Sequence, residues 1–173
     1  MTAFDHLSPQ QFQPIYRGLR LGSPEGVDLS DPEQVFRHIR TRSDRELAAY
    51  ADDYHRWPVF GMHWSTDHET ALRFALSEGN SGEKYAALRE KVIRHPRWGV
   101  VLEIGGSRAP HQKSFEAQDW YGEREVRPPN RADITHMLAH VHVRDDIGAY
   151  PAQSKKPTLI ATHVMPREMW MRG

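Results

Sequence analysis

The sequence predicts an α+β fold, because its helical patterns fall mostly in the first half of the chain and its strand patterns mostly in the second. The 173 residues suffice for a single domain spanning residues 1–173. Five Trp, six Tyr and six Phe supply large side chains for a core, and the hydrophobic fraction of 38% lies above the disordered range. We therefore expect one globular domain.

The first half of the chain predicts one strand followed by helices. Apolar and aromatic residues at 12–19 are typical of a strand. The sequence Ser-Asp-Pro-Glu at 30–33 is a capping box that begins a helix, and Ser43 with Glu46 repeats the pattern for a second helix. That second helix is expected to end at Trp57, because the next residue is proline.

The middle of the chain predicts a strand at 59–64 and two more helices. Thr66 or Asp67 can cap the first of these helices, which Gly79 ends. Periodic apolar residues predict the second helix at 83–94.

The second half changes to strand patterns. Branched or alternating residues predict strands at 99–104, 123–127, 134–143 and 157–165. Residues 105–121 hold few apolar positions and are expected to form a long loop, which in a compact domain is usually functional or disordered.

Composition excludes several kinds of chemistry. The chain has no cysteine, which rules out disulfides, thiolate catalysis and cysteine-ligated metals. Lys and Arg balance Asp and Glu at 23 each, which counts against a broad basic surface for nucleic acid. No signal peptide or membrane-spanning run is visible, so we expect a cytoplasmic protein without a membrane partner.

Three short polar motifs lie on the predicted strands. Arg17 follows an aromatic residue on a strand that otherwise looks buried, and its guanidinium suits phosphate, although a local ion pair is the simpler interpretation of this residue alone. Ser65 and Thr66 lie where a strand meets a helix, where N-capping is the simpler interpretation. Glu123 and Glu125 share one face of a strand, about 7 Å apart, which favours a cation or polar ligand unless the face is simply solvated.

Taken together and in this order, the motifs resemble the mono-ADP-ribosyltransferase family, in the clade with an arginine, a Ser-Thr-Ser-type motif and Glu-x-Glu. Ser65 follows Arg17 by 48 residues (65 − 17), and Glu125 follows Ser65 by 60 (125 − 65). The resemblance covers residues 12–145. It implies two packed, mostly antiparallel β-sheets with surrounding helices that form a cleft for NAD.

The resemblance also implies the roles of individual residues in binding NAD. Arg17 would hold the NAD phosphates, and the Gly18 backbone would hydrogen-bond the nicotinamide amide. Ser65 would lock the cleft and orient the catalytic glutamate, with Thr66 supporting the strand. Phe74 would lie against the nicotinamide ring, although core packing explains an aromatic residue on that helix equally well.

The remaining implied roles concern catalysis and the acceptor. Glu125 would be the catalytic carboxylate, which stabilises the positive charge that develops on the ribose as the bond to nicotinamide breaks. Glu123 would bind the acceptor and help to deprotonate it, which suits an arginine of a target protein. Trp120 and Tyr121, on the long loop, would contact the acceptor.

Two features depart from the family pattern or lie outside it. The third hydroxyl of the Ser-Thr-Ser motif is replaced by Asp67, which can still cap a helix, and residues 82–97 look like an added helix of unknown role. His140 and His142 share a face of a predicted strand, but no third ligand is evident, so we expect a half-exposed strand and no metal site.

The predicted function is therefore NAD-dependent mono-ADP-ribosyl transfer, with NAD as co-substrate and no metal. Three alternatives stay open. The site could mainly hydrolyse NAD, it could modify a nucleic acid or a small molecule, with neutral charge counting against a nucleic acid, or the chain could be a non-catalytic binding module. A toxin, a phage effector and a regulatory enzyme would share this sequence pattern.

Overall fold

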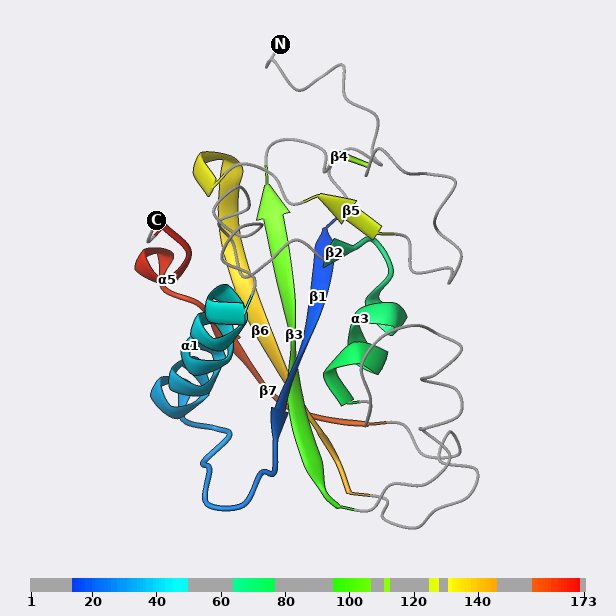
Figure 1. Cartoon of the computed structure of the whole chain (residues 1–173), viewed down its shortest axis with the longest axis vertical. Helices are drawn as coiled ribbons and strands as arrows, with labels where there is room; N and C mark the ends of the chain where they lie inside the picture. The colour runs from blue at the N-terminus through cyan, green and yellow to red at the C-terminus, as the bar shows by residue number, and fades with distance from the viewer. Residues whose placement is uncertain are drawn as a thin grey trace.

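The computed structural model describes residues 14–49, 64–76, 95–106, 111–112, 125–127, 131–145 and 157–171. Three long strands form the centre of the sheet in these parts of the chain: β1 (Ile15–Gly22), β3 (Arg97–Gly106) and β6 (Ile134–Arg144). Figure 1 shows them side by side, with β7 (Thr158–Val164) crossing behind. The other described elements are α1 (Pro32–Ala49), β2 (Trp64–Ser65), α3 (His68–Leu76), β4 (His111–Gln112), β5 (Glu125–Arg127), a 3₁₀ turn (Arg131–Asp133) and α5 (Arg167–Met171).

The described strands form a single antiparallel sheet in the order β4-β5-β2-β1-β3-β6-β7. The α+β class is therefore confirmed, and the strands expected in the second half of the chain are present as β3, β5, β6 and β7. The expected pair of packed sheets is not found among these residues. The physical reason is that β1 is paired on both edges, with β2 on one side and β3 on the other, which joins all the described strands into one ladder.

One face of the sheet, here named the α1 face, carries the larger apolar core. Ile15 and Leu19 of β1 point to it, and Val35, Phe36 and Ile39 of α1 pack against it. Buried residues of the other strands and of the C-terminal segment complete this core: Trp64, Trp98, Val100, Leu102, Ile104, Val126, Ile134, Met137, Ala139, Val141, Met165 and Trp170.

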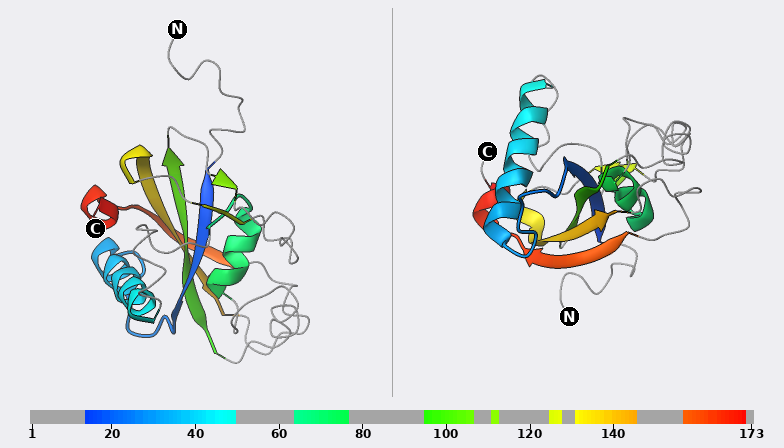
Figure 2. Two further views of the ribbon diagram at one scale, coloured as in Figure 1. Left: turned by 45° about the horizontal axis from the view of Figure 1, so that its top comes forward. Right: turned by 90° about the horizontal axis from the view of Figure 1, so that it is seen from below.

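The opposite face, here named the α3 face, is covered by α3, which packs on β1 and β3 and lies beside β1 on the side away from α1 in Figure 1. A side-chain carbon on Gly18 would overlap the carbonyl oxygen of Ala71, and one on Gly99 would overlap that of Ala75. Glycine is required at both positions because the backbone of the helix rests directly on the strands. Figure 2 shows α1 and α3 at separate places around the sheet.

The beginning and the extent of α1 were only partly predicted correctly. The cap is Asp31 rather than Ser30, because the Asp31 carboxylate accepts the N–H of Glu33 at 3.0 Å. Ser43 does not begin a second helix: α1 continues through it to Ala49, and the Ser43 hydroxyl donates to the carbonyl of Ile39 at 2.9 Å. A serine hydroxyl can bond back to the preceding turn inside a helix, so a capping pattern alone does not fix a boundary.

Several other predictions concern segments that the structure describes only in part. The helix after residue 67 is confirmed as α3, whereas the predicted helix at 83–94 and most of the strand at 59–64 lie outside the described residues. The predicted loop at 105–121 contains the end of β3 and the short strand β4, and α5 was not predicted. No helix in the described part of the chain is long and apolar enough to cross a membrane.

Candidate functional site

The three motif-bearing strands are neighbours in the sheet, in the order β5-β2-β1. Ser65 on β2 is the register partner of Tyr16 on β1 and, on its other side, of Glu125 on β5. Arg17 is the residue after Tyr16. Segments separated by 48 and 60 residues in the sequence are thus brought to one place, with Ser65 at its centre.

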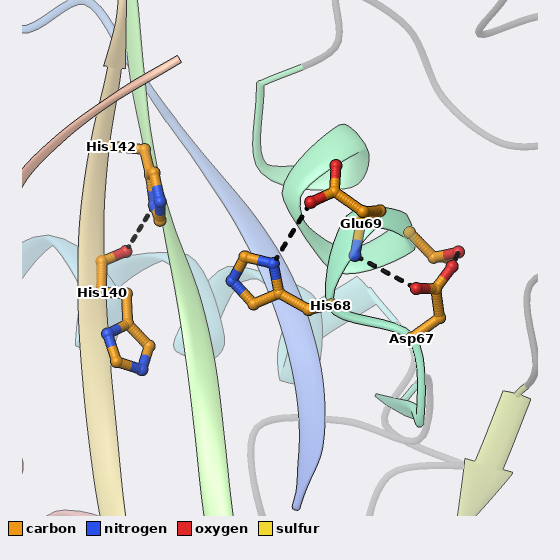
Figure 3. Close-up of polar contacts among 6 residues, drawn as sticks. Asp67, His68, Glu69, His140 and His142 are labelled. Atoms are coloured by element: carbon orange, nitrogen blue, oxygen red, sulfur yellow. Dashed lines mark hydrogen bonds and ion pairs between the residues drawn. The ribbon is translucent and has the colours of Figure 1, made fainter. Parts of the chain in front are cut away.

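Ser65 is held by the turn that begins α3. Its side chain is buried, and its Oγ accepts a hydrogen bond from the backbone N–H of Asp67 at 2.9 Å. Asp67 in turn caps α3: its carboxylate accepts the N–H of Glu69 at 3.3 Å and the hydroxyl of Thr70 at 2.7 Å (Figure 3). Of the two caps that the sequence allows, the structure thus shows Asp67 in the capping position, while Thr66 lies half-buried between Ser65 and the helix.

Arg17 lies on the opposite face of the sheet from Ser65. It is 6% exposed and alternates with the core residues Ile15 and Leu19, which point to the α1 face. Ser65 is paired with Tyr16 and therefore belongs to the α3 face. The structure brings the strands of the motifs together, but it does not bring the side chains of Arg17 and Ser65 to the same face.

Two further predicted residues lie at the contact between β1 and α3. Gly18 is the position on which α3 rests, so its lack of a side chain has a packing reason whatever its backbone binds. Phe74 is half-buried on α3 and belongs to neither apolar cluster of the described residues, whereas its neighbour Ala75 is fully buried. Both interpretations of Phe74, contact with the nicotinamide ring and core packing, therefore stay predictions.

The rest of the predicted site is described only in part. Glu125 is placed by its strand position opposite Ser65, and the next residue, Val126, is buried in the core of the α1 face. Glu123, Trp120 and Tyr121 lie outside the described residues, as does nearly all of the segment 82–97.

Sequence reasoning missed a polar cluster on the α3 face that begins beside Ser65. Tyr16 is the register partner of Glu103 on β3, and the Oε1 of Glu103 lies 3.4 Å from the Nε2 of His140 on β6. The other ring nitrogen of His140, Nδ1, is 3.0 Å from the hydroxyl of Thr162 on β7. Burial raises the pKa of the Tyr16 hydroxyl, and the negative charge of Glu103 adds to the effect. Cross-strand register assembles this cluster, and no sequence spacing reveals it.

The imidazole of His142 is more buried than expected. Its side chain is buried on β6, its Nδ1 lies 3.1 Å from the carbonyl oxygen of His140, and its ring centroid is 6.3 Å from that of His68 (Figure 3). The sequence predicted only that His140 and His142 share one side of a half-exposed strand. In the parts of the chain that the structure describes, no three His, Asp or Glu side chains are arranged to hold a metal ion.

Comparisons with protein families, with curated proteins and with solved structures find no significant match to this chain. The motifs and their arrangement in the fold are therefore the features that point to a function.

Proposed function

We propose that the chain is a mono-ADP-ribosyltransferase that cleaves NAD at the bond between nicotinamide and ribose and transfers ADP-ribose to an acceptor, an arginine of a target protein. The observation that carries the proposal is the adjacency of β5, β2 and β1, with Ser65 in register with both Tyr16 and Glu125. Each of the three motifs has a simpler interpretation when it is taken alone. Those separate interpretations do not explain why the three motifs occupy adjacent strands.

In this proposal Ser65 and Glu125 act as a pair. They are register partners, and partners in an antiparallel ladder have Cβ atoms about 5 Å apart, which is within reach of a hydroxyl and a carboxylate. The bond between Ser65 and the Asp67 N–H uses the serine oxygen as an acceptor, and a hydroxyl can accept and donate at the same time. A donated hydrogen bond would orient a glutamate carboxylate and keep it ionised.

The reaction proposed for this pair is dissociative. As the bond to nicotinamide breaks, positive charge develops on the ribose, and the Glu125 carboxylate stabilises that charge while nicotinamide leaves. The acceptor guanidinium then attacks the ribose carbon, and Glu123 takes the proton that the guanidinium loses. Trp120 and Tyr121 would contact the target protein.

Arg17 fits this proposal less directly than Ser65 does. A buried guanidinium beside the Ser65 strand suits the phosphates of NAD, but its side chain belongs to the α1 face. Binding of one NAD molecule by both Arg17 and Ser65 therefore requires the dinucleotide to contact both faces of the sheet. A separate measurement of NAD affinity tests this role independently of the chemistry.

The experiment incubates the full-length chain with NAD labelled in its adenylate part and a cell lysate, and it follows labelled protein, free ADP-ribose and nicotinamide. Glu125→Gln removes the catalytic charge without changing side-chain shape, and we expect at least a hundredfold loss of nicotinamide release. Glu33→Gln changes an exposed carboxylate on α1 and serves as the matched control, which should keep wild-type activity. A wild-type chain that releases no nicotinamide from NAD contradicts the proposal.

A second pair of variants separates transfer from hydrolysis and from NAD binding. Glu123→Gln should abolish labelled protein while leaving free ADP-ribose, because only acceptor deprotonation is lost. Arg17→Lys should weaken NAD binding with a smaller effect on the rate at saturating NAD, because lysine lacks the forked donor. Free ADP-ribose without labelled protein in the wild type would instead favour an NAD glycohydrolase, and label in the nucleic acid or small-molecule fraction would identify a different acceptor.

A further inference from the structure

Three imidazoles from two elements lie on the α3 face, and two of them, His68 and His142, are in ring contact (Figure 3). His68 is the first residue of α3, and His140 and His142 lie two residues apart on β6. The ring centroid of His68 is 6.3 Å from that of His142 and 5.2 Å from that of Tyr16, whose ring it meets edge-on at 90°. The first turn of α3 is thus in contact with β6 and β1 through rings, two of which can take up a proton.

The hydrogen bond of His142 determines where a second proton would go. Its Nδ1 lies 3.1 Å from the carbonyl oxygen of His140, and a carbonyl can only accept, so the neutral ring carries its hydrogen on Nδ1. A further proton must therefore bind Nε2 of a buried ring. Burial lowers the pKa of His142 below its ordinary value of 6.5, against the effect of the carbonyl, and positive charge on His68 or His140 lowers it further.

The groups that α3 and β1 place near His142 do not offset the positive charge that a second proton would give its ring. Glu69 opposes the lowering of the His142 pKa, but its side chain is 81% exposed and lies 3.8 Å from His68, so water screens its charge. Tyr16 stays neutral in acid, because burial raises its pKa.

The groups on β3, β6 and β7 do not offset the positive charge of a protonated His142 either. On β3, Glu103 lies 3.4 Å from the Nε2 of His140 and so pairs with that ring rather than with His142. On β7, the Thr162 hydroxyl is neutral and bonds to His140. Two residues beyond His142 on β6 lies Arg144, a buried cation.

The two ends of α3 are held differently. It rests on Gly18 at Ala71 and on Gly99 at Ala75, and the carbonyl of Leu76 at its C-terminal end accepts a hydrogen bond from Nη1 of Arg97 at 3.3 Å. None of these contacts depends on a group that titrates near neutral pH. The first turn, in contrast, meets β6 through His68 and His142.

We propose that the contact between His68 and His142 is an acid-sensitive latch, in which the neutral His142 ring holds the first turn of α3 against β6 through His68, and a proton taken up by His142 in mildly acidic solution releases the turn. The released turn contains Asp67, whose N–H holds Ser65, so acid would also loosen Ser65. The latch is independent of the function proposed for the chain, because it concerns only the docking of α3.

Hydrogen exchange of backbone amides tests the latch in the full chain between pH 5 and 8, with rates corrected for intrinsic exchange. In the wild type we expect the opening of α3 to become up to about tenfold more frequent per pH unit below 6.5, because opening takes up a proton. Amides of β3 should show little change. His142→Gln and His68→Gln should each flatten the pH dependence of α3, and the double variant should add nothing further.

His136→Gln is the matched control, because His136 is an exposed imidazole on the same strand. It should leave the slope for α3 unchanged. The latch is refuted if exchange of α3 does not respond to pH, if either single variant keeps the wild-type slope, or if the control removes it. Should a variant fail to fold at pH 8, the wild type decides, because equal slopes in α3 and β3 would refute a local latch.

Discussion

The two faces of the sheet are built by different means. The α1 face buries a large apolar cluster against a helix of 18 residues, whereas the α3 face has a small apolar cluster under a helix of nine. On the α1 face the strands and helix are separated by large side chains, and on the α3 face the helix backbone touches the strands at Gly18 and Gly99. Among the described residues, the α1 face therefore contributes most of the hydrophobic stabilisation.

The difference also concerns polar groups. Ser65, the register position of Glu125, and the cluster of Tyr16, Glu103 and His140 all belong to the α3 face. Arg17, in contrast to these described residues, is buried on the α1 face. One face thus mainly holds the fold together, while the other carries most of the groups capable of chemistry.

The largest expected effect comes from filling the contact beneath α3. Gly18→Ala should destabilise the chain by about 3 kcal/mol, because the new methyl group overlaps the carbonyl of Ala71 and backbone cannot move aside cheaply. Urea unfolding measures this. The control is Gly26→Ala, where space is open and only the positive φ of 76° opposes alanine, at about 1 kcal/mol. Equal losses in the two variants would contradict the close contact.

Adjacent valines on β3 compare the two cores directly. Val100 points to the α1 face and Val101 to the α3 face, and both are fully buried. Val100→Ala should cost about 2 kcal/mol, from two lost methyl groups and the cavity left behind. Val101→Ala should cost less, because a short helix can settle toward the sheet and reduce the cavity. Thermal unfolding compares the two, and a larger loss in Val101→Ala would contradict the difference between the faces.

The caps of the two helices separate stability from function. Asp31→Ala and Asp67→Ala should each cost about 1 kcal/mol of stability, because each removes a carboxylate that accepts an N–H of the first turn. Only Asp67→Ala should also lower nicotinamide release from NAD, since that turn holds Ser65. Asp67→Ser, which keeps a capping oxygen, should restore it. An equal fall of activity in Asp31→Ala would show a general effect of stability.

The smallest expected effect concerns the titration of one carboxyl group, that of Asp28. On the loop before α1, the hydroxyl and N–H of Ser30 lower the pKa of the Asp28 carboxyl below its ordinary 3.8, so this carboxylate favours folding above that value and the contribution is lost as the pH falls through the lowered pKa. Ser30→Ala should move the pKa of Asp28 partly back up, measured by NMR titration. An unchanged pKa would leave the N–H of Ser30 as the sufficient cause.

Local patterns predicted most of the described elements. The strands β3, β6 and β7 were predicted from their branched residues, and α3 from its cap and apolar spacing, because each depends on residues close in sequence. Boundaries were less secure: the capping pattern at Ser43 lies inside α1, since the same hydroxyl can cap a new helix or bond back within one.

The candidate site could be predicted in part for the same reason. The residue types of the three motifs and their order are visible in the sequence, and so is the alternation that predicts one strand face for Glu123 and Glu125. The pairing of Ser65 with both Tyr16 and Glu125 is not, because register between distant strands is set by the packing of whole faces. The opposite placement of Arg17 likewise follows from the core position of Ile15 and Leu19.

The sequence by itself determined the α+β class, most of the described strands, the start of α3 and the residue types available for chemistry, since these depend on local spacing and on side-chain properties. Only the tertiary structure decided that the described strands join in one sheet, that glycines admit α3, and that His68 meets His142. These features join residues far apart in the chain, and their geometry arises from burying apolar surface on both faces of the sheet.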